Sequence, residues 1–232
     1  IFLRLYKNHQ QRNKNEIKTV IHFAGLKSIS ESFKIPNIYW DVNVRGTTNL
    51  LNIMEDNKCF ELIFSSSASV YDQFACSPIP ENSIIKPNNP YGQTKVEVER
   101  ILMDKFKKGD KWRIICLRYF NPIGAHYTGE LGESPLNLAT NLFPLICKVA
   151  LGEMNYLPIY GNDWPTKDGT SIRDFIHIID LVEGHIEAFK YFQKVEKCYE
   201  NINLGTGKGT TVLELIKTFE RINHVNINYQ FK

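Results

Sequence analysis

Residues 60–71 read FELIFSSSASVY, and residues 89–108 read NPYGQTKVEVERILMDKFKK. The first stretch is a short apolar run that ends in serines, a pattern typical of a buried strand with a polar exit. The second stretch places its apolar residues at helical spacing and begins after a proline, which is favourable at the start of a helix. Together the two stretches predict a strand, a polar turn and a helix.

Similar pairs of runs recur along the chain. Further strands are predicted at Lys18–Ala24, Arg113–Tyr119, Leu157–Tyr160, Tyr199–Leu204 and Asn226–Phe231, and further helices at Tyr39–Asn57, Asn137–Leu151, Asp180–Lys194 and Thr211–Asn223. Alternation of short strands and longer helices indicates βαβ units and a parallel sheet covered by helices. We therefore predict an α/β fold.

Composition excludes several classes of protein. The 232 residues carry a net charge of +3, and their Lys and Arg residues are scattered, so nucleic acid is not an expected partner. No apolar run approaches the roughly 18 residues of a membrane span. The five cysteines form no CxxC pair, which favours reduced thiols in a cytoplasmic protein. The histidines show no close ligand spacing, so no metal site is predicted.

Tyr91 and Lys95 are the first candidates for catalysis. Their i,i+4 spacing puts a phenol and an ammonium on one face of the predicted helix, and a nearby cation favours the phenolate. Such a phenol can take a proton from a hydroxyl group. By itself YxxxK is expected about once by chance in this chain. Ser67 adds weight, because loops at the carboxyl ends of parallel strands form the ligand crevice.

Two glycine-containing segments are candidates for nucleotide binding. Ala24-Gly25 ends a predicted strand and allows close approach to the backbone; Lys27 follows it, and Asn43 begins the next predicted helix. The run Gly205–Gly209 reads GTGKG, which lacks the spacing of a dinucleotide loop and of a phosphate P-loop. A tight turn before a helix capped by Thr211 and Glu214 is the better interpretation.

The order of the segments VIHFAGLK, FSSSASVY, NPYGQTK, RYFNPIGAH, GNDWPTKDGTSIRDFIHIIDL and NLGTGKGTTVLE resembles the extended short-chain dehydrogenase/reductase family, and within it the UDP-galactose 4-epimerases. The resemblance implies a doubly wound Rossmann-type sheet that binds NAD, with a smaller mixed α/β part for the sugar nucleotide. It implies reversible oxidation at sugar C4 that interconverts UDP-galactose and UDP-glucose, in a homodimeric protein.

The resemblance also assigns residues. Tyr91, Lys95 and Ser67 would be catalytic. The cofactor would be held by Phe23, Ala24, Gly25, Lys27, Asn43, Ser65, Tyr91, Lys95 and Tyr119. The substrate would be held by Ser67, Tyr91, Asn121, Asn141, Leu142, Ile159, Tyr160 and Arg173. A guanidinium such as that of Arg173 suits a bidentate contact with a diphosphate.

This sequence departs from the family pattern at several points. Asp72 stands where a glycine is usual, and Thr140 where the family has the first of two asparagines. No glycine precedes Gly25, so we expect the family's first βαβ unit, with its glycine-rich loop, to lie outside this sequence. We therefore expect a segment of a longer protein, inactive by itself. Residues 1–121 and 172–196 would belong to the NAD-binding domain, and 122–171 and 197–232 to the sugar-nucleotide part.

Three alternative functions stay open. An epimerase for another UDP-sugar, such as UDP-xylose or a UDP-uronate, would have the same motifs. A sugar-nucleotide 4,6-dehydratase would need an Asp-Glu pair where this chain has Ser67-Ala68-Ser69. A non-catalytic binding scaffold is the alternative from a different class.

Overall fold

A computed structural model describes residues 16–109, 111–133 and 141–232. The described residues form two compact units, one within residues 16–119 and 183–204 and the other within residues 120–182 and 205–232. The first unit contains β1 (Thr19–His22), α2 (Ile29–Lys34), α3 (Pro36–Trp40), η1 (Asp41–Arg45), α4 (Gly46–Asp56), β2 (Glu61–Ser67), η2 (Ala68–Val70), α5 (Pro90–Lys108), β3 (Arg113–Tyr119), β8 (Cys198–Leu204) and most of α7 (Ile178–Phe192).

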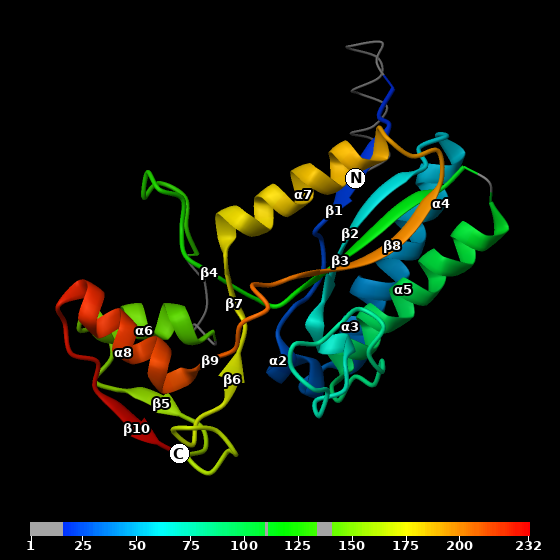
Figure 1. Ribbon diagram of the computed structural model, residues 1–232. Coiled ribbons are helices and arrows are strands. Elements are labelled where there is room, and N and C mark those ends of the chain that lie inside the picture. Colours follow the sequence, from blue (N-terminus) through cyan, green and yellow to red (C-terminus); the bar gives the residue numbers. More distant parts are fainter. Residues whose placement is uncertain (1–15, 110, 134–140) are drawn as a thin grey trace. The chain divides into compact units, whose positions relative to one another are not determined.

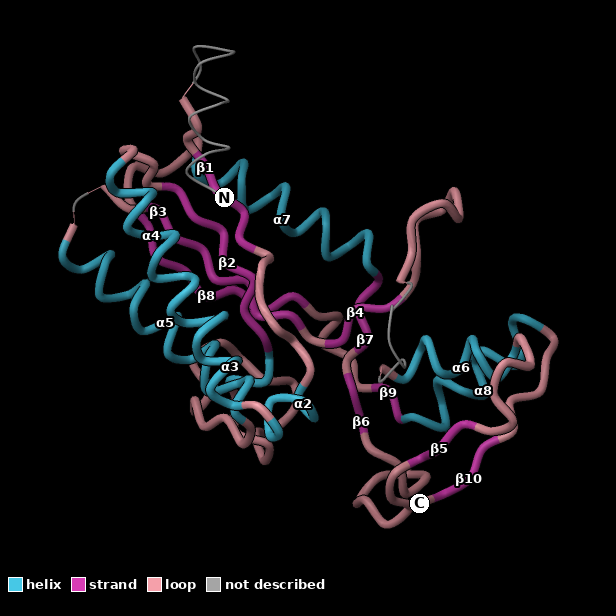
Figure 2. Tube along the Cα trace, turned by 180° about the vertical axis from the view of Figure 1, so that it is seen from behind, coloured by secondary structure: helices cyan, strands magenta, loops and turns pink. Residues whose placement is uncertain are grey.

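The first unit is built on a four-stranded sheet in the order β1-β2-β3-β8, in which each neighbouring pair is parallel. The helices α4 and α5 lie on one side of these strands and α7 lies on the other (Figures 1 and 2). The predicted α/β fold with a parallel sheet is therefore confirmed. Strands that are apolar on both faces suit this position between two helical layers.

Alternate residues of the central strands enter two separate cores. Leu62 and Phe64 of β2 pack with Val98 and Leu102 of α5, whereas Ile63 packs on the opposite face with Phe192 of α7. Because successive strand side chains point to opposite faces, one apolar run supplies both cores. The same alternation continues through the serines at the end of β2, so the side chains of Ser66 and Ser67 point to opposite faces of the sheet.

The helix α5 begins as the sequence predicts. Asn89 is its N-cap and accepts a hydrogen bond from the Gly92 amide at 2.8 Å, and Pro90 occupies the first turn. The predicted helix at Tyr39–Asn57 is wrong in detail, because it is divided into α3, the π-helical turn η1 and α4. Wider turns of this kind are frequently found at functional sites.

The second unit packs two helices on a small sheet. It contains β4 (Asn121–Ile123), α6 (Leu142–Ala150), β5 (Leu157–Ile159), β6 (Ile172–Arg173), β7 (Phe175–His177), β9 (Thr210–Thr211), α8 (Val212–Asn223) and β10 (Tyr229–Phe231). β5 pairs in parallel with β10, and Ile146 of α6, Leu157 of β5 and Ile216 of α8 share one apolar core. Residues 137–140 of the predicted helix at Asn137–Leu151 lie outside the described part of the chain.

The boundaries between the units differ from those expected. β8 was expected in the second part, but it pairs with β3 along its whole length and so belongs to the first unit. Residues 172–182 were expected in the first part, but β7 pairs with β4 and joins the second unit. In both cases strand pairing, which the sequence does not display, decides the assignment.

Candidate active site

Ser67, Tyr91 and Lys95 come together where β2 ends and α5 begins. Ser67 is buried at the carboxyl end of β2, and its hydroxyl lowers the pKa of Tyr91 against the larger, opposite effect of burial. The Ser67 oxygen also accepts a hydrogen bond from the Ser69 amide at 3.1 Å, which starts the short helix η2. The predicted grouping of a serine, a phenol and an ammonium is thus present in the first unit.

Lys95 is buried and turns its ammonium toward the strand end. Its Nζ donates a hydrogen bond to the Ser65 carbonyl oxygen at 2.8 Å and lies 4.8 Å from the centroid of the Phe64 ring. Burial lowers the pKa of Lys95 to about 8, against the opposing influence of Glu99. No carboxylate of the described residues forms an ion pair with this ammonium.

The pKa of Tyr91 does not follow the expectation. Burial raises it, and the hydrogen bond with Ser67 only partly opposes this effect. Lys95 was expected to lower it, yet its Nζ lies 5.7 Å from the centroid of the phenol ring and is bonded to a carbonyl instead. In the protein alone, loss of hydration therefore outweighs the field of the neighbouring cation.

Asn43 fastens the turn after β1 to α5. Its side-chain oxygen accepts a hydrogen bond from the Leu26 amide at 2.8 Å, and its Nδ2 donates to the Leu26 carbonyl and to Thr94 Oγ1 at 3.0 Å each. A Cβ added to Gly25 would lie 3.0 Å from Asn43 Oδ1. The close approach predicted for Gly25 is therefore found, and the approaching group is the buried amide of Asn43.

Aromatic side chains gather beside the exit of β1. The exposed ring of Phe23 lies 4.9 Å from the ring of His185. His185 Nε2 lies 2.6 Å from the Tyr119 hydroxyl. His185 was not among the predicted site residues, although a histidine within the apolar face of a predicted helix is a detectable signal. Ala24 and Lys27 are both exposed next to this group.

Apart from Ser67 and Tyr91, the residues expected to hold the sugar nucleotide lie in the second unit. Asn121 is exposed at the start of β4, and Asn141, the N-cap of α6, donates a hydrogen bond to Glu133 at 3.1 Å. Tyr160 is 76% exposed and Arg173 is exposed on β6, whereas Leu142 and Ile159 pack in the core of this unit. The buried side chain of Ile159 therefore contributes to the apolar core of this unit.

The GTGKG segment is a turn held by Asp174. Asp174 accepts hydrogen bonds from the backbone amides of Thr206 at 2.9 Å and Gly207 at 2.8 Å. Thr211 then caps α8 by accepting a hydrogen bond from the Glu214 amide at 3.2 Å, as predicted. The amides that a phosphate would need are already occupied by a carboxylate.

Asp72 and Thr140 are the two residues that differ from the family pattern, and only Asp72 lies in the described part of the chain. Asp72 accepts a hydrogen bond from the Phe74 amide at 3.1 Å and lies 3.5 Å from Lys86. Thr140 lies outside the described residues. Among the residues that are described, no cluster of three or more His, Cys, Asp or Glu side chains could hold a metal ion, and no helix is long and apolar enough to cross a membrane.

Comparison with known proteins identifies the class. Residues 7–205 match the model of the NAD dependent epimerase/dehydratase family, and the chain belongs to that family. It is 51% identical over 203 residues to UDP-glucose 4-epimerase 2 of Oryza sativa subsp. japonica, covering 87% of this chain and 50% of the rice protein. The chain thus spans half the length of that relative.

Two solved structures share the fold. UDP-glucose-4-epimerase from Stenotrophomonas maltophila, with bound NAD and formylated UDP-arabinopyranose, is 40% identical with a TM-score of 0.92, covering 99% of this chain and 67% of that one. UDP-glucose 4-epimerase from Bifidobacterium longum, in complex with NAD+ and UDP, is 41% identical with a TM-score of 0.90, covering 99% and 69%.

Proposed function

We propose that the complete protein carrying this sequence is a UDP-glucose 4-epimerase that interconverts UDP-galactose and UDP-glucose with NAD as its cofactor. The observation that carries the proposal is the cluster of Ser67, Tyr91 and Lys95 at the carboxyl end of β2. The names of the relatives support the same activity. As the resemblance implies, the protein would act as a homodimer in the cytoplasm.

The residues of the first unit fit NAD. The Lys95 ammonium is buried with a backbone carbonyl as its partner, so ribose hydroxyl groups would complete its hydrogen bonding. Phe23, Ala24 and Gly25 expose an apolar surface and bare backbone beside it. When bound, NAD supplies a reversible two-electron acceptor for the C4 carbon of the sugar.

The side chains of the site handle the proton. The Tyr91 phenolate takes the proton of the sugar C4 hydroxyl as the alcohol becomes a ketone, and returns it when the ketone is reduced on its other face. Ser67, which ends β2 and interacts with Tyr91, orients the sugar hydroxyl group. Lys95, one helical turn away, stabilises the phenolate by its charge. Arg173 of the second unit would bind the diphosphate, which leaves the hexose free to turn.

A dehydratase is disfavoured by the same strand end. Elimination of water would need an acid beside the hydroxyl-positioning residue, and the residues there are Ser67, Ala68 and Ser69. An epimerase for UDP-xylose or a UDP-uronate is distinguished from a UDP-glucose 4-epimerase by assaying turnover of each of these UDP-sugars.

The test is a turnover assay of the complete protein. Purified protein is incubated with UDP-galactose, UDP-xylose and UDP-glucuronate, and the products are separated by chromatography. We expect UDP-glucose from UDP-galactose, and a loss of about 10²–10⁴-fold in kcat for Tyr91→Phe. Tyr127→Phe is the matched control, because Tyr127 is 88% exposed. A wild-type rate in Tyr91→Phe would overturn the mechanism, and turnover of another sugar alone would replace the substrate.

A further inference from the structure

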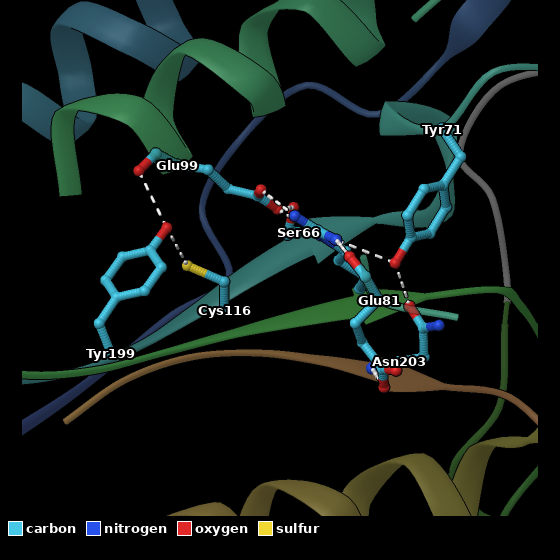
Figure 3. A network of polar contacts seen from close by, with 8 residues as sticks. Ser66, Tyr71, Glu81, Glu99, Cys116, Tyr199 and Asn203 are labelled. Atoms are coloured by element: carbon cyan, nitrogen blue, oxygen red, sulfur yellow. Dashed lines mark hydrogen bonds and ion pairs between the residues drawn. The ribbon is translucent and has the colours of Figure 1, made fainter. Parts of the chain in front are cut away.

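A buried ion pair lies behind the candidate active site. Arg118 of β3 donates from Nη2 to Glu99 Oε2 at 2.6 Å and from Nε to Glu99 Oε1 at 3.0 Å. The two side chains are only 2% and 7% exposed. Burial alone would lower the pKa of Arg118, but the hydrogen bonds and charge of Glu99 outweigh it and raise that pKa. Figure 3 shows Glu99 within a network of polar contacts that includes Ser66, Tyr71 and Asn203.

The carboxylate end of the pair holds the serine strand. Ser66 Oγ donates to Glu99 Oε1 at 2.6 Å, and Ser66 is 1% exposed. Its two neighbours belong to the candidate site: the Ser65 carbonyl accepts from Lys95, and the Ser67 hydroxyl lowers the pKa of Tyr91. Glu99 also follows Lys95 by one helical turn and Tyr91 by about two turns on α5.

The Arg118 guanidinium binds residues that follow the short helix η2 in the chain. Arg118 Nη1 donates to the Tyr71 hydroxyl at 2.9 Å and to the Glu81 carbonyl at 3.0 Å. The Tyr71 hydroxyl in turn donates to Asn203 Oδ1 on β8 at 2.6 Å (Figure 3). The pair therefore joins β2, β3, β8, α5 and the residues after η2 into one rigid arrangement.

Stability alone is a weak reason for such a pair. Taking two charges out of water costs free energy that their attraction often only repays, so an apolar replacement of the pair can be neutral or stabilising. The same attachment, however, fixes the two backbones that carry Ser65, Ser67, Tyr91 and Lys95. In addition, the negative charge of Glu99 opposes the effect of burial on the pKa of Lys95.

We propose that Glu99, held by Arg118, is a positioning residue for the epimerase reaction: it locks the serine strand end against α5 and places a negative charge one helical turn from Lys95. The proposal rests on the function proposed above. Neither residue contacts the reacting groups directly, since Glu99 acts through Ser66 and through its charge.

Four titratable groups influence Lys95 or lie against it. On α5 they are Glu99 and Tyr91, on β3 Cys116, and on β1 His22. Burial raises the pKa of the Cys116 thiol and lowers that of His22 to about 4, so both are neutral near pH 7. Glu99 is then the charged neighbour that favours the ammonium. Its removal should let Lys95 lose its proton at a lower pH.

The test is Glu99→Gln in the complete protein with NAD, which keeps the shape of the side chain but not its charge. We expect kcat at pH 7 to fall about 10-fold or more with KM for UDP-galactose nearly unchanged. The high-pH limb of the kcat profile should move about one unit toward lower pH. Glu97→Gln, on the same helix but paired at the surface with Arg100, is the matched control and should leave the profile unmoved.

A second variant separates positioning from folding. If Glu99→Gln is unstable because Arg118 is left buried and unpaired, Glu99→Gln with Arg118→Met removes both charges and should fold. It should show the same lowered kcat and shifted limb. A folded variant with wild-type kcat and an unmoved limb would overturn the positioning role, even at a lowered Tm. A wild-type protein without epimerase activity would overturn the proposed function as well.

Discussion

The ammonium of Lys95 lies 5.7 Å from the centroid of the Tyr91 ring while it donates a hydrogen bond to the Ser65 carbonyl oxygen. Two residues one turn apart on α5 are thereby tied to the end of β2. The YxxxK spacing is common in sequences, but here the Lys95 ammonium contacts both the end of β2 and the Tyr91 ring of α5. These contacts bring the helix and the strand together as one site. It also sets the expected behaviour of variants.

Replacing Lys95 with methionine should shift the pH optimum of the complete protein upward. The phenolate of Tyr91 loses a stabilising cation, so the phenol ionises at a higher pH. The pH profile of kcat with UDP-galactose measures the shift. Lys105→Met, which removes a lysine from the far end of the same helix, is the control and should keep the wild-type optimum. An unmoved optimum in Lys95→Met would argue against the electrostatic role.

Gly25→Ala should destabilise the first unit by about 1–2 kcal/mol, because the new Cβ would meet Asn43 Oδ1 at 3.0 Å. Thermal or urea unfolding measures the change. A double-mutant cycle with Asn43→Ala provides the control, since the penalty should nearly vanish once the amide is gone. An equal penalty in both backgrounds would show that Asn43 is not the obstacle.

His22 should make the protein less stable as the pH falls from 6.5 toward 4. Burial, helped by Lys95, lowers the pKa of His22 to about 4, so between these values the unfolded chain binds a proton that the folded chain rejects. This contribution to stability is fully present above pH 6.5, and about 3 kcal/mol of it is lost by pH 4. In denaturant titrations, the free energy of unfolding of His22→Gln should fall by that much less than that of the wild type between pH 7 and pH 4. Identical losses in both proteins would contradict the prediction.

The 232-residue chain expressed by itself should neither retain NAD nor epimerise UDP-galactose. Pyrophosphate is normally held by amides at a helix N-terminus after a glycine-rich loop. No glycine precedes Gly25 in this sequence, and the amides of Thr206 and Gly207 are held by Asp174. Denaturing the purified chain and assaying the supernatant for NAD measures retention. Stoichiometric NAD with turnover would refute the prediction.

Several elements could be read from the sequence because their signals are local. Arg113–Tyr119 is a strand with the predicted bounds, and Pro90 with Asn89 marks the start of α5. The capping residue Thr211 and the grouping of Ser67 with Tyr91 were also predicted. Apolar periodicity and caps act over a few residues, so the linear sequence contains them completely.

Other features depend on contacts between distant residues. The π-helical turn η1, the place of β8 in the first unit and the Asp174 contacts of the GTGKG turn were not predicted. The pairing of β8 with β3 and the contacts of Asp174 join residues far apart in the chain. A local sequence pattern cannot show which strand will pair with a predicted strand, or which carboxylate will bind the amides of a predicted turn.

The sequence by itself determined the α/β class, the residue types of the site and their order along the chain. Only the tertiary structure decided that Glu99 meets Arg118, that Asn43 reaches Leu26 and that the Lys95 ammonium meets a carbonyl rather than the phenol. The physical reason is burial: the pKa values of Tyr91, Lys95 and His22 follow from loss of hydration. Hydration is lost only when helices and strands pack together.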